Sequence, residues 1–143
     1  MNFTIIPQSW TPSLHGALRI MTGLTLLEHG TAKFFSFPLV DGLDKMPAAM
    51  LGVTGGLELV GGALVAVGLF TRPVAFLLAG FMAAAYFIAH APGSFFPIVN
   101  HGEAAILYCF VFLFLAAAGP GRWALEGTYG QAGPAQAFKP KVA

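Results

Sequence analysis

Charged residues are scarce in this chain. Only 9% of its 143 residues are Asp, Glu, Lys or Arg, whereas 57% are hydrophobic. A soluble domain usually carries about a quarter charged residues, so this composition excludes an ordinary soluble domain. The formal net charge is +1, and the chain has no cluster of Lys and Arg, which argues against nucleic acid as a partner.

Cysteine is almost absent. The single Cys109 lies inside an apolar run, so one copy of the chain cannot form a disulfide, a CxxC redox pair or a Cys-rich metal site. We expect it to be a small buried or lipid-facing residue. No metal-ligand spacing motif is present either, so no metal site is predicted.

The first thirteen residues lack the basic region of a signal peptide, which predicts that the first apolar run stays in the membrane as an anchor.

Long apolar runs are what the sequence does contain. A helix needs about 20 residues to cross a bilayer core of about 30 Å, and four runs approach this length: 14–37, 48–70, 74–90 and 103–118. Lipid tolerates no unpaired backbone groups, so spanning segments without the alternation of a barrel must be helices. The sequence predicts an all-α, polytopic membrane protein with a bundle of four transmembrane helices. Its parts are an N-terminal cytoplasmic segment (1–13), the membrane domain (14–126) and a flexible cytoplasmic tail (127–143).

Turn and charge signals add detail to this topology. Thr11 followed by Pro12 is typical of a helix N-cap, and the apolar stretch 94–99 is expected to lie as a loop on the outer surface. The positive-inside rule predicts a bacterial inner membrane protein with both termini cytoplasmic. The connections on the predicted cytoplasmic side contain Arg72, Arg122, Lys139 and Lys141. Those on the predicted outer side contain only Lys45, which lies next to two aspartates.

Eight ionisable residues fall within or beside the apolar runs, where each is costly unless it is paired or hydrated. They are Arg19, Glu28, His29, Lys33, Glu58, His90, His101 and Glu103. At 1.5 Å per helical residue, the topology puts Glu28 and Glu58 roughly 14 and 16 Å below the outer boundary. Arg19 is expected to snorkel to the inner surface, and the other seven gather in the outer half of the bundle.

This cluster suggests a polar site with two kinds of role. Glu28, His29 and Glu58 are candidate catalytic residues of a proton relay, and Lys33, His90, His101 and Glu103 are candidate ligand-binding residues. Structural interpretations remain open beside this one. Lys33 can pair with a carboxylate, Asn100 and Glu103 have the spacing of a capping box, and the whole cluster can be an ion-paired core.

Glycines surround Glu58 on its own helix face, at Gly55, Gly61 and Gly62. Glycine lets a neighbouring backbone approach closely, and Gly52 with Gly56 adds a GxxxG spacing. The sequence therefore predicts close helix packing around this carboxylate.

These stretches resemble the DoxX family of small bacterial membrane proteins over residues 14–126. The resemblance rests on LRIMTGLTLLEHGTAKFF in the first run, GLELVGGALVAVGLFTRPVAFLLAGFMAAA across the second and third, and NHGEAAILYCFVFLFLAAAGPGRWALE through the fourth. It implies a four-helix membrane bundle. It also implies a link to redox functions, because family members include thiosulfate:quinone oxidoreductase subunits, membrane oxidoreductase assemblies and products of quinone-stress operons, although related animal proteins are receptor-assembly chaperones.

Our first hypothesis is an integral membrane subunit associated with quinone-linked redox chemistry, with the Glu/His pocket in the outer half of the bundle. A quinone is then the candidate cofactor, and Phe34, Phe35, Tyr86 and Phe87 are expected to pack against its head group. The alternative is a non-catalytic structural or assembly subunit of a larger membrane complex. Besides the lipid bilayer, the expected partners are other membrane subunits or further copies of the chain; small-molecule transport by an oligomer is a third option.

Overall fold

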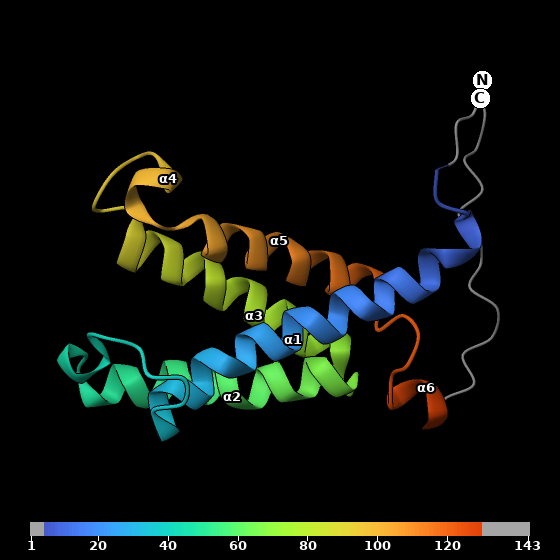
Figure 1. Cartoon of the computed structure of the whole chain (residues 1–143), viewed down its shortest axis with the longest axis horizontal. Coiled ribbons are helices and arrows are strands. Elements are labelled where there is room, and N and C mark those ends of the chain that lie inside the picture. The colour runs from blue at the N-terminus through green and yellow to red at the C-terminus, as the bar shows by residue number, and fades with distance from the viewer. Residues whose placement is uncertain (1–4, 130–143) are drawn as a thin grey trace.

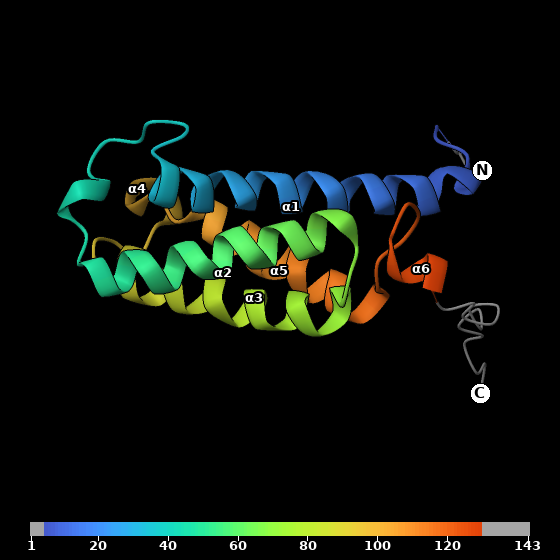
Figure 2. The ribbon, with the colours of Figure 1, turned by 90° about the horizontal axis from the view of Figure 1, so that it is seen from below.

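The fold is entirely helical over residues 5–129, the part of the chain that this computed structural model describes. Four long helices lie side by side (Figures 1 and 2): α1 (Thr11–Phe35), α2 (Ala48–Val67), α3 (Thr71–Ala85) and α5 (Glu103–Ala118). Short helices lie at their ends: η1 (Gln8–Trp10), η2 (Leu43–Lys45), the π-helix η3 (Tyr86–His90), α4 (Pro97–Asn100) and α6 (Glu126–Tyr129). The predicted tail falls mostly outside the described residues.

The helix boundaries differ from the predicted runs in informative places. The run 103–118 coincides with α5, but α1 begins at Thr11 with Trp10 as its N-cap, so the prediction of a Thr11 cap is wrong by one residue. The second run ends at Val67 because Gly68 and Phe70 both have positive φ values, 70° and 52°, which turn the chain into α3. The predicted outer loop contains the short helix α4.

Glycines bring the backbones of α1 and α2 into direct contact. A Cβ atom placed on Gly62 would lie 2.7 Å from the backbone nitrogen of Leu27, and one on Gly30 would lie 2.5 Å from that of Leu59. The close packing predicted around Glu58 is therefore present, with α1 as the neighbouring helix. Gly52 and Gly56, by contrast, have no atom within 4 Å of such a position.

Substitution of Gly62 tests this contact. We expect Gly62→Ala to lower the free energy of unfolding by about 1–3 kcal/mol, because the new methyl group overlaps the α1 backbone. Gly56→Ala is the matched control on the same helix and should leave stability unchanged or raise it, since the methyl group meets open space and alanine favours the helix. Thermal unfolding in detergent measures both variants. Equal losses in the two would contradict the proposed contact.

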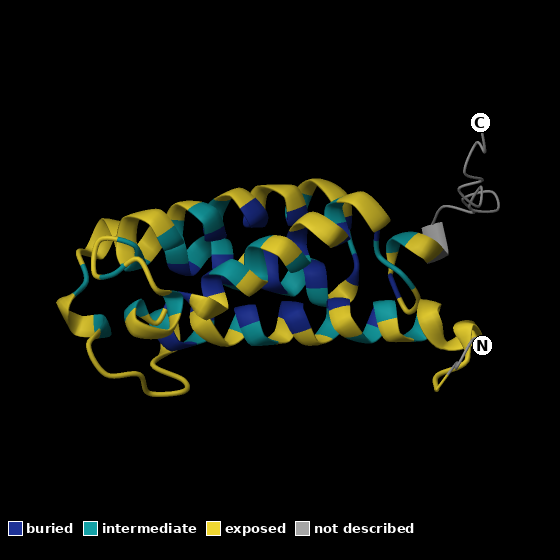
Figure 3. Ribbon diagram, turned by 90° about the horizontal axis from the view of Figure 1, so that it is seen from above, coloured by how far each residue is buried: buried dark blue, intermediate teal, exposed yellow. Residues whose placement is uncertain are grey.

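A hydrophobic core fills the space between two helix pairs, α1 with α2 and α3 with α5. Leu26, Val65, Leu78, Phe112 and Leu115 are all at most 1% exposed. The outer faces of the helices carry large exposed apolar side chains, as the outward yellow bands of Figure 3 show. Two segments, Ala48–Val67 and Thr71–Gly93, are long and apolar enough to cross a membrane by length and composition, and Glu103–Ala118 is a shorter apolar helix.

Arg19 is fully buried, so the prediction that it snorkels to the inner surface is wrong. Its guanidinium donates five hydrogen bonds of 2.5–3.1 Å to backbone carbonyl oxygens. The acceptors are Val65 and Ala66 at the end of α2, and Pro120, Arg122 and Trp123 after α5. Five donors with five acceptors leave this cation fully satisfied without contact with water.

The segment that follows α5 closes this end of the bundle (Figure 2). The backbone nitrogens of Leu125 and Glu126 donate to the carbonyl oxygens of Val67 and Gly68, each at 3.0 Å. The Glu126 carboxylate accepts a 3.2 Å hydrogen bond from the backbone nitrogen of Thr71, which caps the start of α3. The GPGRWALE stretch therefore serves as a structural clasp.

Replacement of Arg19 by lysine tests the clasp. We expect Arg19→Lys to lower the free energy of unfolding by about 3 kcal/mol or more, because an ammonium group has three donors for five buried acceptors. The control is Arg122→Lys, since the Arg122 side chain is exposed, donates to the Ser13 hydroxyl at 3.1 Å and lies over the Trp123 ring, 5.6 Å from its centroid. Chemical denaturation in detergent gives the comparison. Equal stability of Arg19→Lys and the wild type would rule out this role.

Candidate functional site

A polar cavity of about 310 Å³ lies between α1, α3 and α5, at the end of the bundle that carries α4. Its wall includes four ionisable residues, His29, Glu58, His90 and His101. The rest of the wall is formed by Leu26, Phe81, Met82, Ala85, Ala104, Ala105 and Tyr108. A few polar groups in an otherwise apolar wall are typical of a small-molecule site, and the volume is at the lower end of the usual range of about 300–1,000 Å³.

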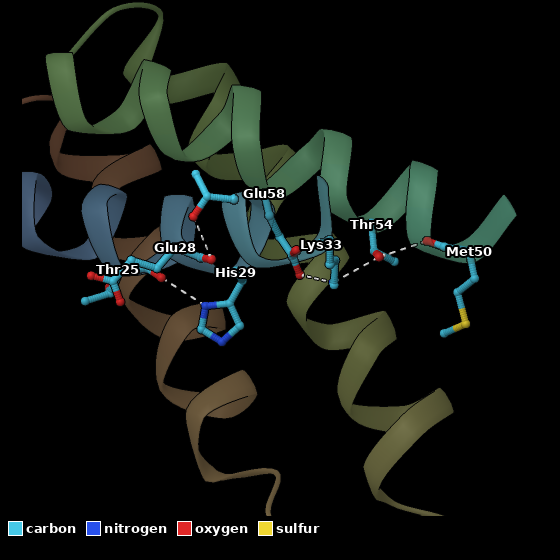
Figure 4. Close-up of polar contacts among 8 residues, drawn as sticks. Thr25, Glu28, His29, Lys33, Met50, Thr54 and Glu58 are labelled. Carbon is cyan, nitrogen blue, oxygen red and sulfur yellow. Dashed lines mark hydrogen bonds and ion pairs between the residues drawn. The ribbon is translucent and has the colours of Figure 1, made fainter. Parts of the chain in front are cut away.

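An ion pair between α1 and α2 lies beside this cavity (Figure 4). Lys33 Nζ is 2.7 Å from Glu58 Oε1, and the two side chains are 11% and 7% exposed. The same ammonium group donates to Thr54 Oγ1 at 3.0 Å, and Thr54 in turn donates to the Met50 carbonyl at 2.8 Å. The close α1–α2 packing leads directly to this pair, because Gly30 lies against Leu59, the residue after Glu58.

Among the residues that the structure describes, none donates a hydrogen bond to the second carboxylate oxygen of Glu58. Glu58 Oε2 is buried, whereas Oε1 carries the contact with Lys33. A buried acceptor without a donor costs about 1–3 kcal/mol. A bound molecule that supplies a hydroxyl or N–H group at this oxygen would recover that cost.

Backbone carbonyls determine which ring nitrogen carries the hydrogen in two neutral histidines of the cavity wall. His29 Nδ1 lies 2.9 Å from the Thr25 carbonyl oxygen, and His90 Nδ1 lies 3.0 Å from that of Asn100. A carbonyl oxygen can only accept, so each Nδ1 carries the hydrogen. In the neutral imidazole, Nε2 of both residues is therefore an acceptor. The His29 ring also meets the Tyr108 ring edge-on, with centroids 6.2 Å apart.

The Asn100–Gly102 turn joins α4 to α5 beside the π-helix. Asn100 Oδ1 accepts from the backbone nitrogen of Gly102 at 2.7 Å, and its Nδ2 donates to the Ser94 carbonyl at 2.8 Å. The N-cap of α5 is Gly102, without a side-chain cap, so the predicted capping box of Asn100 with Glu103 does not form. π-Helical turns such as η3 are frequent at functional sites, and this one carries His90 into the wall.

The predicted site residues divide into two groups. His29, Glu58, His90 and His101 share the polar cavity, and Lys33 contacts Glu58. Glu28 and Glu103 are exposed and are not part of that wall. Glu28 instead lines a smaller cavity of about 140 Å³ with His29 and Lys33, so His29 borders both cavities. Within residues 5–129, no group of three or more His, Cys, Asp or Glu side chains is arranged to hold a metal ion.

Tyr108 is a member of the wall that sequence reasoning missed. It lies about one helical turn after Ala104 and Ala105, so its hydroxyl-bearing ring falls on the side of α5 that lines the cavity. That spacing was available in the sequence. Met82 and Phe81 carried no comparable signal, because they stand among many apolar residues of α3.

An apolar groove adjoins the polar cavity on the other side of the α3–α5 contact. Its volume is about 310 Å³, and it shares Met82 and Ala105 with the polar cavity. The other residues of its wall are Ala83, Tyr86, Phe87, Ile106, Cys109 and Phe110. Of the four aromatic residues predicted to contact a head group, Tyr86 and Phe87 line this groove, whereas Phe34 and Phe35 are exposed and line neither space.

The fold and site define a small helical membrane protein with a polar cavity beside a buried ion pair. The DoxX family model matches residues 15–91, which include most of α1 and all of α2, α3 and η3. An uncharacterized protein of Haemophilus influenzae is 41% identical over 127 residues, covering 85% of this chain and 95% of that protein. The chain therefore belongs to the DoxX family. No solved structure is significantly similar to it.

A double-mutant cycle tests the ion pair. We expect Lys33→Met and Glu58→Gln each to lower the free energy of unfolding by about 3–5 kcal/mol, because each leaves one buried charge unpaired. The double variant should lose less than the sum, since neither charge remains. Lys45→Met, on an exposed residue of η2, is the control and should change stability by less than about 0.5 kcal/mol. Strictly additive losses would contradict the pairing.

Proposed function

We propose that α1, α2, α3 with η3, and α5 all cross the bacterial inner membrane as a bundle of four transmembrane helices. Support comes from large exposed apolar side chains on each of them, among them Leu24, Val60, Phe76 and Phe110. Contiguous apolar surface of this kind is costly in water and favourable in lipid. Arg19 and the Lys33–Glu58 pair fit this setting because their charges are bonded inside the bundle.

The orientation that we propose has both termini in the cytoplasm. The start of α1 and the clasp lie at one end of the bundle (Figure 2), the end that also carries Arg72 and Arg122. The opposite end carries Lys45 together with Asp41 and Asp44. The excess of arginine at the first end supports a cytoplasmic position for it.

We further propose that the protein is a membrane subunit of quinone-linked redox chemistry, and that the polar cavity binds the quinone head group. The observation that carries this proposal is the cavity itself. Three histidines and a carboxylate with an unpaired oxygen line a space of about 310 Å³ with otherwise apolar walls. Such a wall suits a ring that bears oxygen atoms, with Phe81 and Tyr108 available to pack against its faces.

The adjoining groove supports a ligand that is a lipid. It is lined by apolar and aromatic side chains and shares the wall residues Met82 and Ala105 with the polar cavity. A hydrocarbon tail attached to a head group in the polar cavity can lie in this groove between α3 and α5. Long-tailed quinones have this combination of a polar ring and an apolar chain.

Glu28 and His29 supply the outer part of the proposed proton relay. Glu28 is exposed and borders the smaller cavity, and His29 borders both that cavity and the polar one. In this proposal His29 Nε2, the nitrogen not bonded to the Thr25 carbonyl, takes up a proton from the side of Glu28 and releases it to the head group beside Glu58. Glu103 has no part in this route, since it lies outside the polar wall.

A second candidate function is that of a structural or assembly subunit of a larger membrane complex. The observation that favours it is the pair Gly52 and Gly56 on α2, of which Gly52 is exposed and Gly56 is half-buried. Neither glycine has an atom within 4 Å of the position where a Cβ would stand, so that face can accept the helix of a partner or of a second copy.

Mass spectrometry of the gently solubilised protein tests the quinone proposal. We expect a quinone to copurify with the wild type, and its occupancy to fall at least about tenfold in Glu58→Gln and in Ala83→Phe, which fills the groove. Glu103→Gln is the matched control and should keep the wild-type occupancy, because its side chain lies outside both spaces.

Two results would count against the quinone proposal. One is a bundle without quinone at fixed stoichiometry with a larger protein, which favours the assembly role. The other is equal quinone occupancy in all three variants, which points to association with the bulk lipid.

A further inference from the structure

Three polar groups in the wall of the polar cavity offer hydrogen-bond acceptors when the two histidines are neutral. Glu58 Oε2 is an unpaired carboxylate oxygen. His29 and His90 each donate from Nδ1 to a backbone carbonyl, so the neutral rings keep only the lone pair of Nε2 for other partners. These acceptors come from three different elements, α2, α1 and η3.

The nearest cation does not offset this excess of acceptors. Lys33 Nζ is engaged with Glu58 Oε1 and Thr54 Oγ1, and Lys33 is not part of the polar wall. The remaining polar groups of the wall, the Tyr108 hydroxyl and the exposed His101 imidazole, can either donate or accept. No group in the wall is restricted to donation in the part of the chain that the structure describes.

We infer that the polar cavity selects the reduced, dihydroxy form of the head group over the oxidised dione. A hydroquinone brings two O–H donors to a wall of acceptors, whereas a quinone brings only carbonyl acceptors, which leave Glu58 Oε2 unpaired. This inference rests on the proposed function and deepens it, because it assigns the redox state that the resting protein binds. Only binding is involved, and no electron transfer within the chain is required.

The size of the expected preference for the reduced form follows from the hydrogen bond to Glu58. A hydrogen bond to a charged group is worth about 10- to 160-fold in affinity. A neutral glutamine in place of Glu58 lowers this advantage, since its amide also offers donors to a quinone carbonyl. The preference for the reduced form should therefore decrease in Glu58→Gln.

Ligand titration of the purified full chain in lipid nanodiscs provides the test. Ubiquinol-1, ubiquinone-1 and the dimethyl ether of ubiquinol-1 are titrated under argon at pH 8, where imidazole side chains are ordinarily neutral. We expect ubiquinol-1 to bind at least about tenfold more tightly than the other two, since the ether keeps the ring but has lost both donors. Glu58→Gln should reduce this ratio towards one, and Glu103→Gln should preserve it.

The outcomes separate this inference from the proposed function. Equal affinities of the wild type for ubiquinol-1 and ubiquinone-1, or tighter binding of the latter, would overturn the inference and leave the quinone proposal standing. Binding of none of the three compounds would overturn both. Tight binding of the dimethyl ether would show that ring shape, rather than donation to Glu58 and the histidines, determines affinity. The wild-type comparison requires no variant to fold.

Discussion

The contact between the backbones of α1 and α2 is the constraint on which the site depends. Gly30 and Gly62 remove the side chains that would hold these helices apart. At this separation Lys33 of α1 reaches Glu58 of α2, and a carboxylate that would be prohibitively costly in an apolar bundle is held as an ion pair. Larger side chains at the glycines would separate the helices and leave both charges unpaired.

The division of the bundle into two pairs explains why a cavity exists beside this ion pair. Figure 1 shows the α3–α5 pair diverging from the α1–α2 pair towards the end that carries α4. The clasp around Arg19 holds the pairs together at the other end. The space that opens between them is only partly filled by Phe81, Met82 and Tyr108, and the two histidines with fixed tautomers border what remains.

Composition and hydropathy were sufficient to predict an all-helical protein, and the start and end of α5 were predicted correctly because Gly102 and Gly119 bound its apolar run. Glu58 and three histidines line one cavity, and the roles predicted for them stay predictions. The rotation of a helix about its own axis could not be predicted from the sequence, because it depends on packing with every neighbouring helix. For that reason Glu28, one residue before His29, was assigned to the same pocket although it faces away from it. Arg19 was misjudged because its five acceptors come from segments 46 to 104 residues away, which no local pattern reveals.

Those sequence separations determine when each acceptor of Arg19 becomes available during synthesis of the chain. Val65 and Ala66 emerge from the ribosome soon after Arg19, but Pro120, Arg122 and Trp123 are synthesised about a hundred residues later. Until that last segment arrives, three of the five donors of the guanidinium must be hydrated or bonded elsewhere. The first of the four long helices to be synthesised therefore depends on the segment after α5 to pair its buried cation.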